Sequence, residues 1–187
     1  MRYNLVAIGS EVLNVQQVKL QLSIDSDEWD SLLETYIEAA RASAEHYTDR
    51  TLVQKRVTEN YDAFPIGGEA IELSFAPVRE IQSVQYIDED GATQTWSASN
   101  YKTDLSEGLP ARITEAFDVN WPTIRDEINA VTVSYDIGPI NPDDVPGTVI
   151  QGMLLEVGAY FEQRHDSVRK MPTAAENLYH KAKKTFL

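Results

Sequence analysis

The hydrophobic pattern of this chain changes its period twice. Apolar residues recur at helical spacing over residues 13–48 and again from residue 145 to the end, whereas residues 51–136 alternate between apolar and polar positions as strands do. The pattern predicts an α+β protein, in which N- and C-terminal helices form a bundle and a small antiparallel β-sheet module is inserted between them. We expect a discontinuous helical part, residues 1–50 and 137–187, with residues 51–136 as the inserted β module.

Two helix starts are expected near the N-terminus. Asn14 followed by Gln17 approximates a capping box for a short helix, and Asp25 followed by Glu28 predicts a second start. The longer helix then carries apolar residues three and four apart: Trp29, Leu32, Leu33, Tyr36, Ile37, Ala40, Ala44 and Tyr47. Its other face is charged and predicts a solvated surface: Asp30, Glu34, Glu38, Arg41 and Glu45.

The middle of the chain predicts short strands separated by turns. A broken alternation starts at Thr51 and stops at the turn of residues 65–68. The run Asp88-Glu89-Asp90-Gly91 predicts a hairpin turn between residues 81–87 and 92–96. Further strands are predicted at residues 71–75, 101–105, 112–114 and 130–135. Short strands with tight turns are typical of a small antiparallel sheet or barrel.

Two more helices are predicted after residue 145. Pro146 falls in a first helical turn, where its missing N–H costs nothing, and Gly152 and Gly158 indicate close helix packing. The apolar positions of this helix are Val149, Met153, Val157, Tyr160 and Phe161. A break at Met171-Pro172 precedes a short terminal helix that contains Ala175, Leu178, Tyr179, Ala182 and Phe186.

Composition and charge narrow the function classes. The chain has 187 residues and no cysteine, which excludes disulfides and thiolate metal sites and fits a reducing cytoplasm. It shows no apolar run typical of a signal peptide or a membrane span, so we expect a soluble protein made inside the cell. Residues 1–165 carry 11 basic and 28 acidic side chains, a net charge of −17, whereas residues 166–187 carry a net charge of +3. An acidic body with a basic tail is not expected to bind DNA non-specifically.

Known catalytic and metal-binding patterns are not found in the sequence. His46, His165 and His180 lack metal-ligand spacing, and the chain has no GxSxG, Walker A or GxGxxG pattern. The run at residues 88–91 resembles a calcium loop only superficially, because an EF-hand would need Gly at Thr93 and Glu at Ser99. We therefore expect no catalytic residue, no metal and no cofactor.

Aromatic residues in the strand module have two interpretations. Tyr86, Trp96 and Tyr101 beside Lys102 are of a kind that stacks single-stranded nucleic acid, and the same holds for Arg112, Trp121 and Arg125. The acidic residues of the same region oppose that role, so packing in the core of the sheet is the preferred interpretation.

The end of the long helix carries a run that resembles a family signature. Residues 39–50 contain the pattern AAR..AE.YT.R, with Ala40, Arg41, Glu45, Tyr47 and Arg50 among its positions. This run is similar to the signature of tailed-bacteriophage head-tail connector (adaptor) proteins, of the type with a strand-rich insertion in a helical core. Matching positions follow in the same order over about residues 13–180, among them Pro77, Gly91, Arg112, Trp121, Pro122, Asn129, Pro146, Tyr160 and Arg164. Gly138 followed by Pro139 departs from the family pattern, and residues 1–12 look like an extension.

The resemblance implies a structural virion protein and not an enzyme. A connector of this family is expected to form a ring, with twelve copies the expected number, below the portal of the DNA-filled capsid. The implied partners are the portal protein, a stopper or other neck or tail protein, further copies of the chain, and packaged DNA that passes through the channel without sequence-specific binding. No membrane is involved. The implied location is the virion neck, between head and tail, and the host cytoplasm during assembly.

Physical reasoning adds roles for particular segments. The basic tail offers apolar anchors with complementary charge, which makes these residues portal-docking candidates: Leu178, Tyr179, Lys181, Lys183, Lys184 and Phe186. The alternative is that this helix packs on its own subunit. The acidic body suits a channel lumen, and the strand module and the long helix are expected to share the contacts between copies. The alternative function is a stand-alone β-sheet module that binds a ligand or peptide on a helical scaffold.

Overall fold

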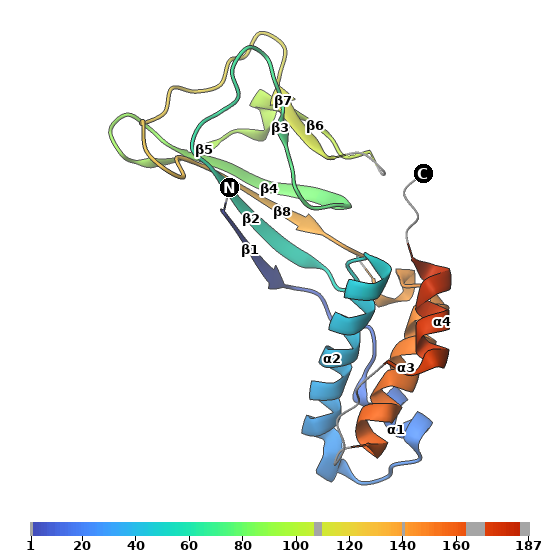
Figure 1. The fold of residues 1–187 in the computed structure, drawn as a ribbon. Coiled ribbons are helices and arrows are strands. Elements are labelled where there is room, and N and C mark those ends of the chain that lie inside the picture. The colour runs from blue at the N-terminus through green and yellow to red at the C-terminus, as the bar shows by residue number, and fades with distance from the viewer. Residues whose placement is uncertain (1, 107–109, 140, 164–170, 184–187) are drawn as a thin grey trace. The chain divides into compact units, whose positions relative to one another are not determined.

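The computed structural model describes residues 2–106, 110–139, 141–163 and 171–183. These residues belong to two compact units (Figure 1). The strand unit consists of Met1–Ile8 and Gln54–Gly138, and the helical unit consists of Gly9–Val53 and Pro139–Leu187. The predicted α+β class is confirmed.

Four α-helices make up the described part of the helical unit: α1 (Val15–Leu22), α2 (Asp30–Thr48), α3 (Gly147–Glu162) and α4 (Thr173–Ala182). The apolar residues predicted at helical spacing form one core, which includes Leu33, Ile37, Val149, Met153 and Val157. Helical periodicity predicted this core because each helix buries one stripe of its surface.

The two predicted helix starts have different outcomes. Asn14 caps α1 as expected: its side chain accepts from the Gln17 N–H at 2.9 Å, and the Gln17 side chain accepts from the Asn14 N–H at 2.9 Å. The start predicted at Asp25 is wrong. A 3-10 turn, Asp27–Trp29, leads directly into α2. The Ser26 hydroxyl accepts a hydrogen bond from the Glu28 N–H in this 3-10 turn. The hydroxyl of Ser26 therefore takes the place of the expected Asp25 carboxylate.

Eight strands form two antiparallel sheets in the described part of the strand unit. The five-stranded sheet has the order β1-β2-β8-β4-β5, and its strands are β1 (Arg2–Ala7), β2 (Lys55–Tyr61), β8 (Val131–Ile137), β4 (Val78–Ile87) and β5 (Thr93–Trp96). The three-stranded sheet has the order β3-β7-β6, and its strands are β3 (Ile71–Glu72), β7 (Arg112–Glu115) and β6 (Tyr101–Asp104).

The first strand was not predicted. β1 pairs with β2 along its whole length, from Arg2 opposite Asn60 to Ala7 opposite Lys55. Residues 1–50 are predicted to belong to the helical part, and this prediction is wrong for Arg2–Ala7. The alternation that marks a half-buried strand is missing because nearly every side chain of this edge strand is exposed.

The hairpin turn between β4 and β5 is confirmed. The Gly91 N–H donates to the Asp88 carbonyl at 2.9 Å, and Gly91 has a φ of +86°, which favours glycine. The Asp88 carboxylate accepts from the Gln94 side chain and from the N–H groups of Ala92 and Asp90. These bonds, that from Gln94 first, lower the pKa of Asp88. Its carboxylate stabilises the turn, as the preferred interpretation of residues 88–91 requires.

Aromatic rings fill the core of the strand unit. Phe64 stacks on Trp121 at a centroid distance of 4.7 Å, and Trp96 lies 4.6 Å from Trp121. Tyr86 and Tyr101 pack at the margin of the same cluster. The interpretation of these rings as core residues is confirmed, because their faces contact one another and are not presented as a platform for bases.

Candidate functional site

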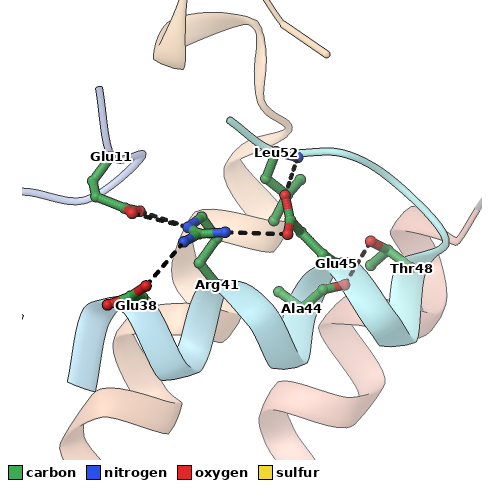
Figure 2. A network of polar contacts seen from close by, with 7 residues as sticks. All are labelled: Glu11, Glu38, Arg41, Ala44, Glu45, Thr48 and Leu52. Atoms are coloured by element: carbon green, nitrogen blue, oxygen red, sulfur yellow. Dashed lines mark hydrogen bonds and ion pairs between the residues drawn. The ribbon is translucent and has the colours of Figure 1, made fainter. Parts of the chain in front are cut away.

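The signature at residues 39–50 lies on the last turns of α2 and the residues that follow (Figure 2). Ala40 and Ala44 are completely buried, which brings the backbone of α2 close to the helices packed on it. Their small side chains explain why this part of the signature is built from alanine.

Arg41 is the centre of a polar network within the helical unit. Its Nε lies 2.9 Å from both carboxylate oxygens of Glu11, and its other nitrogens lie 3.2 Å from Glu45 and 3.8 Å from Glu38 (Figure 2). The Arg41 side chain is only 10% exposed. The prediction that Arg41 belongs to a solvated face is therefore wrong, although the predicted pairs with Glu38 and Glu45 are present.

Glu45, Thr48 and Arg50 form further bonds at the end of α2, within the helix and to neighbouring segments. The second oxygen of Glu45 accepts the Leu52 N–H at 2.9 Å, and the Thr48 hydroxyl donates to the Ala44 carbonyl at 2.7 Å (Figure 2). Arg50 Nε donates to the carbonyl of Ala182, at the end of α4, at 2.7 Å.

This set of bonds gives the signature a structural meaning. Glu11 belongs to the segment before α1, Leu52 to the segment after α2, and Ala182 to the last described helix. We call Glu11, Arg41, Glu45 and Arg50 the α2 latch, because together they hold α2 to all three segments. A buried guanidinium is tolerated only when its charge is paired and its donors are bonded, and the latch meets this condition for Arg41.

The terminal helix α4 packs on its own subunit. Tyr179 is completely buried, and its hydroxyl donates to Glu156 of α3 at 2.9 Å, while Tyr160 donates to the same carboxylate at 2.6 Å. Burial raises the pKa of Tyr179 and of Tyr160 far above the usual range, with the Glu156 carboxylate adding to the effect. The prediction that Tyr179 is an apolar anchor for the portal is therefore wrong.

Gly152 makes this packing possible. A Cβ at Gly152 would meet the Tyr179 ring, with Cδ1 at 2.9 Å and Cε1 closer still. The close packing predicted at Gly152 is thus confirmed, and Tyr179 is the residue that requires it.

The other docking candidates divide into two groups. Lys181 and Lys183 are exposed at the end of α4, and Leu178 is half-buried. Lys183 also lies 6.0 Å from the centroid of the Tyr47 ring. Lys184 and Phe186 lie outside the described residues, so their predicted role has no structural description.

The remaining family-motif positions are also structural. Arg112 pairs with Asp104 at 2.7 Å, and both side chains are partly exposed. Trp121 packs against the aromatic core, and Pro122, the next residue, is half-buried. Pro146 directly precedes α3, and Arg164 lies outside the described residues.

No metal centre or membrane helix is present among the described residues. No group of three His, Asp or Glu side chains there is arranged to hold a metal ion, and no described helix has the length and apolar character needed to cross a bilayer. His46 and His180 are exposed, and His165 lies outside the described residues. A cleft of about 600 Å³ between residues 10–15 and α2 is lined by Glu11, Glu34 and Glu38 together with aliphatic and hydroxyl side chains. These residues do not form a catalytic constellation.

Two residues central to this arrangement were not singled out in the sequence. Glu11 pairs with Arg41, which lies thirty residues later in the chain. Glu156, on the buried face of α3, accepts hydrogen bonds from the hydroxyl groups of Tyr160 and Tyr179. The Glu156 spacing to Tyr160 is a helical i,i+4 pair, which is a usable signal, whereas nothing in the sequence links Glu11 to Arg41.

Solved structures of similar fold come from gene transfer agent particles. The neck of the native gene transfer agent particle, with C12 symmetry, contains a chain with 21% identity and a TM-score of 0.70. The virion of the native gene transfer agent particle and the neck of the empty particle, with C6 symmetry, each contain a chain with 22% identity, at TM-scores of 0.72 and 0.71. In all three cases the similarity covers 99% of this chain and 96% of the other chain.

A family model matches the part of the chain that contains the signature and most of the strands. No curated protein sequence matches this chain. The model of the phage gp6-like head-tail connector protein matches residues 13–130, which is more than half of the chain. This match includes the α2 latch residues Arg41, Glu45 and Arg50 and the aromatic core, so the protein belongs to the phage gp6-like head-tail connector family.

Proposed function

We propose that this protein is the adaptor ring of a virion neck. It joins the portal of a DNA-filled capsid to a stopper or other tail protein, and packaged DNA passes through the ring. The observation that carries this proposal is the family match, together with similarity over 99% of the chain to necks that have C12 and C6 symmetry. The proposed role is architectural and includes no catalytic step.

A stiff helical unit supports this role. The α2 latch and the Glu156 pair with its two tyrosines tie the helices α2, α3 and α4 to one another and to the segments around them. Buried polar bonds that cross-link helices rigidify the unit, which suits a subunit placed between head and tail.

The exposed end of α4 is the proposed portal-docking element. Lys181 and Lys183 are exposed there beside the half-buried Leu178, which leaves charge and some apolar surface available to a partner. Tyr179 holds this element in place from inside the helical unit. Lys184 and Phe186 continue the same basic and apolar composition.

The acidic surface suits a channel for DNA. A net charge of −14 gives repulsion between the ring and the phosphates, and repulsion prevents the adhesion that many phosphate contacts would create. Retarded migration of linear DNA by the purified ring at 50 mM salt would contradict this part of the proposal.

Electron microscopy of the purified protein mixed with its portal is the direct test. The proposal predicts a coaxial ring on the tail-facing side of the portal, with subunits of this chain around an open channel. A protein that stays separate from the portal, or that binds it as single copies at irregular positions, would overturn the proposal.

A further inference from the structure

The five-stranded sheet ends in two exposed edges. β1 and β5 are its outermost strands among the described residues (Figure 1). Every side chain of β1 except Leu5 is exposed, and three of the four in β5 are exposed as well. Both edges are therefore accessible to a strand from another chain.

The hydrogen-bond register shows which backbone groups of β1 face outward. The Ile8 N–H donates to the Gln54 carbonyl at 2.9 Å. Bonded and non-bonded pairs alternate along an antiparallel ladder, so Tyr3, Leu5 and Ala7 direct their N–H and C=O groups away from β2.

The same reasoning applies to β5. The Asp88 N–H donates to the Ala92 carbonyl at 3.0 Å, so the alternation leaves Thr93 and Thr95 with their backbone groups directed away from β4. Each edge of the sheet thus carries a short row of outward donors and acceptors.

Apart from Arg2 at the start of β1, neither edge carries the charges that usually protect edge strands from pairing. Residues 3–10 and residues 92–100 contain no charged side chain, although the chain has 30 acidic residues. β1 also exposes two apolar side chains, with Tyr3 60% and Val6 52% exposed. In a chain of net charge −14, these are surfaces where two copies meet with little repulsion.

The number of strands fixes how the two edges run. All neighbouring pairs are antiparallel, so β1 and β5 of a five-stranded sheet run in the same direction. Adjacent copies in a twelvefold ring differ by a rotation of about 30°, so β5 of one copy and β1 of the next would run nearly parallel. Pairing of β1 with β1 would instead need a twofold axis, which closes a dimer.

Parallel pairing also brings unlike charges together. Arg2 is exposed at the start of β1, and β5 starts directly after the turn that exposes Glu89 and Asp90. The start of β1 in one copy would therefore lie near the acidic turn of the next, where opposite charges favour this register.

We propose that β1 of one copy adds to the β5 edge of the next, so that the five-stranded sheets continue from subunit to subunit. The inference rests on the ring proposed above and names the contact that closes it. Arg2 then lies opposite Thr93 and Asn4 opposite Thr95, and the outward backbone groups of the two strands bond in the slanted pattern of a parallel pair.

Engineered cysteines test this contact, because the chain has none of its own. The register of the sheet places Arg2 in one row across the strands with Asn60, Thr132, Gln85 and Thr95. Asn4 is two residues after Arg2 and therefore shares its face, so Asn4 and Thr95 lie on the same face of the sheet. The double variant Asn4→Cys/Thr95→Cys, mixed with its portal and oxidised, should give a ladder of covalent multimers. The matched control Asn4→Cys/Gln94→Cys places one cysteine on the opposite face and should give no ladder.

The outcomes separate this contact from the ring itself. Rings seen by electron microscopy without a ladder would overturn the sheet continuation and leave the ring intact. If neither rings nor a ladder formed, both the ring and the sheet continuation would be rejected. Efficient dimer formation by Asn4→Cys alone would show β1–β1 pairing and overturn the proposal.

A pair of proline variants gives a second test that does not depend on disulfide geometry. Ala7→Pro removes an N–H that faces outward, so the monomer should keep its circular dichroism spectrum and lose ring formation. Val6→Pro removes an N–H that bonds β2, so it should destabilise the monomer itself. Rings that persist in folded Ala7→Pro would contradict the proposed contact.

Discussion

The guanidinium Nε of Arg41 lies 2.9 Å from both carboxylate oxygens of Glu11, thirty residues earlier in the chain. This pair joins the long helix α2 to the segment before α1. It explains why an arginine follows the two alanines that open the signature, since a long cationic side chain on α2 can reach that segment.

Loss of the Arg41 charge should destabilise the helical unit strongly. Arg41→Met keeps the apolar stem but removes the ion pair with Glu45, whose side chain is 14% exposed, and the bonds to Glu11. Breaking such a pair should cost about 3 kcal/mol of unfolding free energy, or roughly 6–12 °C in Tm. Thermal unfolding followed by circular dichroism measures the change.

Glu38→Gln is the matched control for this network. Glu38 also faces Arg41, but its side chain is 72% exposed and 3.8 Å away. Surface pairs contribute little, so this substitution should change the unfolding free energy by less than about 0.5 kcal/mol. Equal effects of Arg41→Met and Glu38→Gln would show that the buried network does not stabilise the fold.

Gly152 and Gly158 of α3 should respond to alanine in opposite directions. Gly152→Ala places a Cβ against the Tyr179 ring and should cost about 1–3 kcal/mol of unfolding free energy, because the rigid ring is held by Glu156. A Cβ at Gly158 would lie 3.5 Å from Leu22 Cδ2, an ordinary contact, so Gly158→Ala should gain up to about 1 kcal/mol from helix propensity. Urea unfolding of both variants checks the sign of each change.

Alkaline pH should destabilise the protein through its buried tyrosines. Burial raises the pKa of Tyr61, Tyr135, Tyr160 and Tyr179 in the folded state, whereas the unfolded chain releases these phenolic protons near pH 10. The unfolded state therefore binds fewer protons above pH 10. The unfolding free energy should be insensitive to these groups below pH 10 and fall above it, by up to about 1.4 kcal/mol per pH unit for each tyrosine.

Urea unfolding between pH 8 and pH 11.5 measures this slope. The double variant Tyr160→Phe/Tyr179→Phe removes two of the four groups and should reduce the slope above pH 10. Phenolate absorbance at 295 nm should rise together with unfolding for the remaining buried rings. A slope unchanged by the double variant would show that these two tyrosines ionise equally in both states.

Much of the fold was predictable because it is encoded locally. The spacing of Leu33, Ile37 and Ala40 predicted the buried stripe of α2, and the turn chemistry of Asp88 and Gly91 predicted the β4–β5 hairpin. In each case the signal and the structure it predicts lie within a few residues of each other.

The features that were missed depend on partners far away in the chain. β1 gave no alternating pattern, and only its pairing with residues 55–60 makes it a strand. Arg41 was assigned to a solvated face because its helix position is polar, but Glu11 and Glu45 make its burial possible. The sequence predicts Tyr179 as an apolar anchor for the portal, whereas its role in the core depends on Gly152 and Glu156 of another helix.

The proposed portal contact should depend on the exposed lysines of α4. Lys181→Glu/Lys183→Glu reverses two exposed charges and leaves the buried Tyr179 in place, so the helical unit should stay folded. The variant should bind the portal at least about tenfold more weakly at low salt, and the difference should narrow as salt screens the charges.

Lys102→Glu provides the charge control for this measurement. Lys102 is exposed on β6 of the strand unit, so it changes the net charge without touching α4. Biolayer interferometry with immobilised portal should give wild-type affinity for this variant. If net charge alone caused the attraction, the single substitution would instead weaken portal binding, by about half the free energy lost in the double variant. If Lys102→Glu weakens binding by half as much free energy as the double variant, the attraction comes from net charge and the end of α4 is not the docking element.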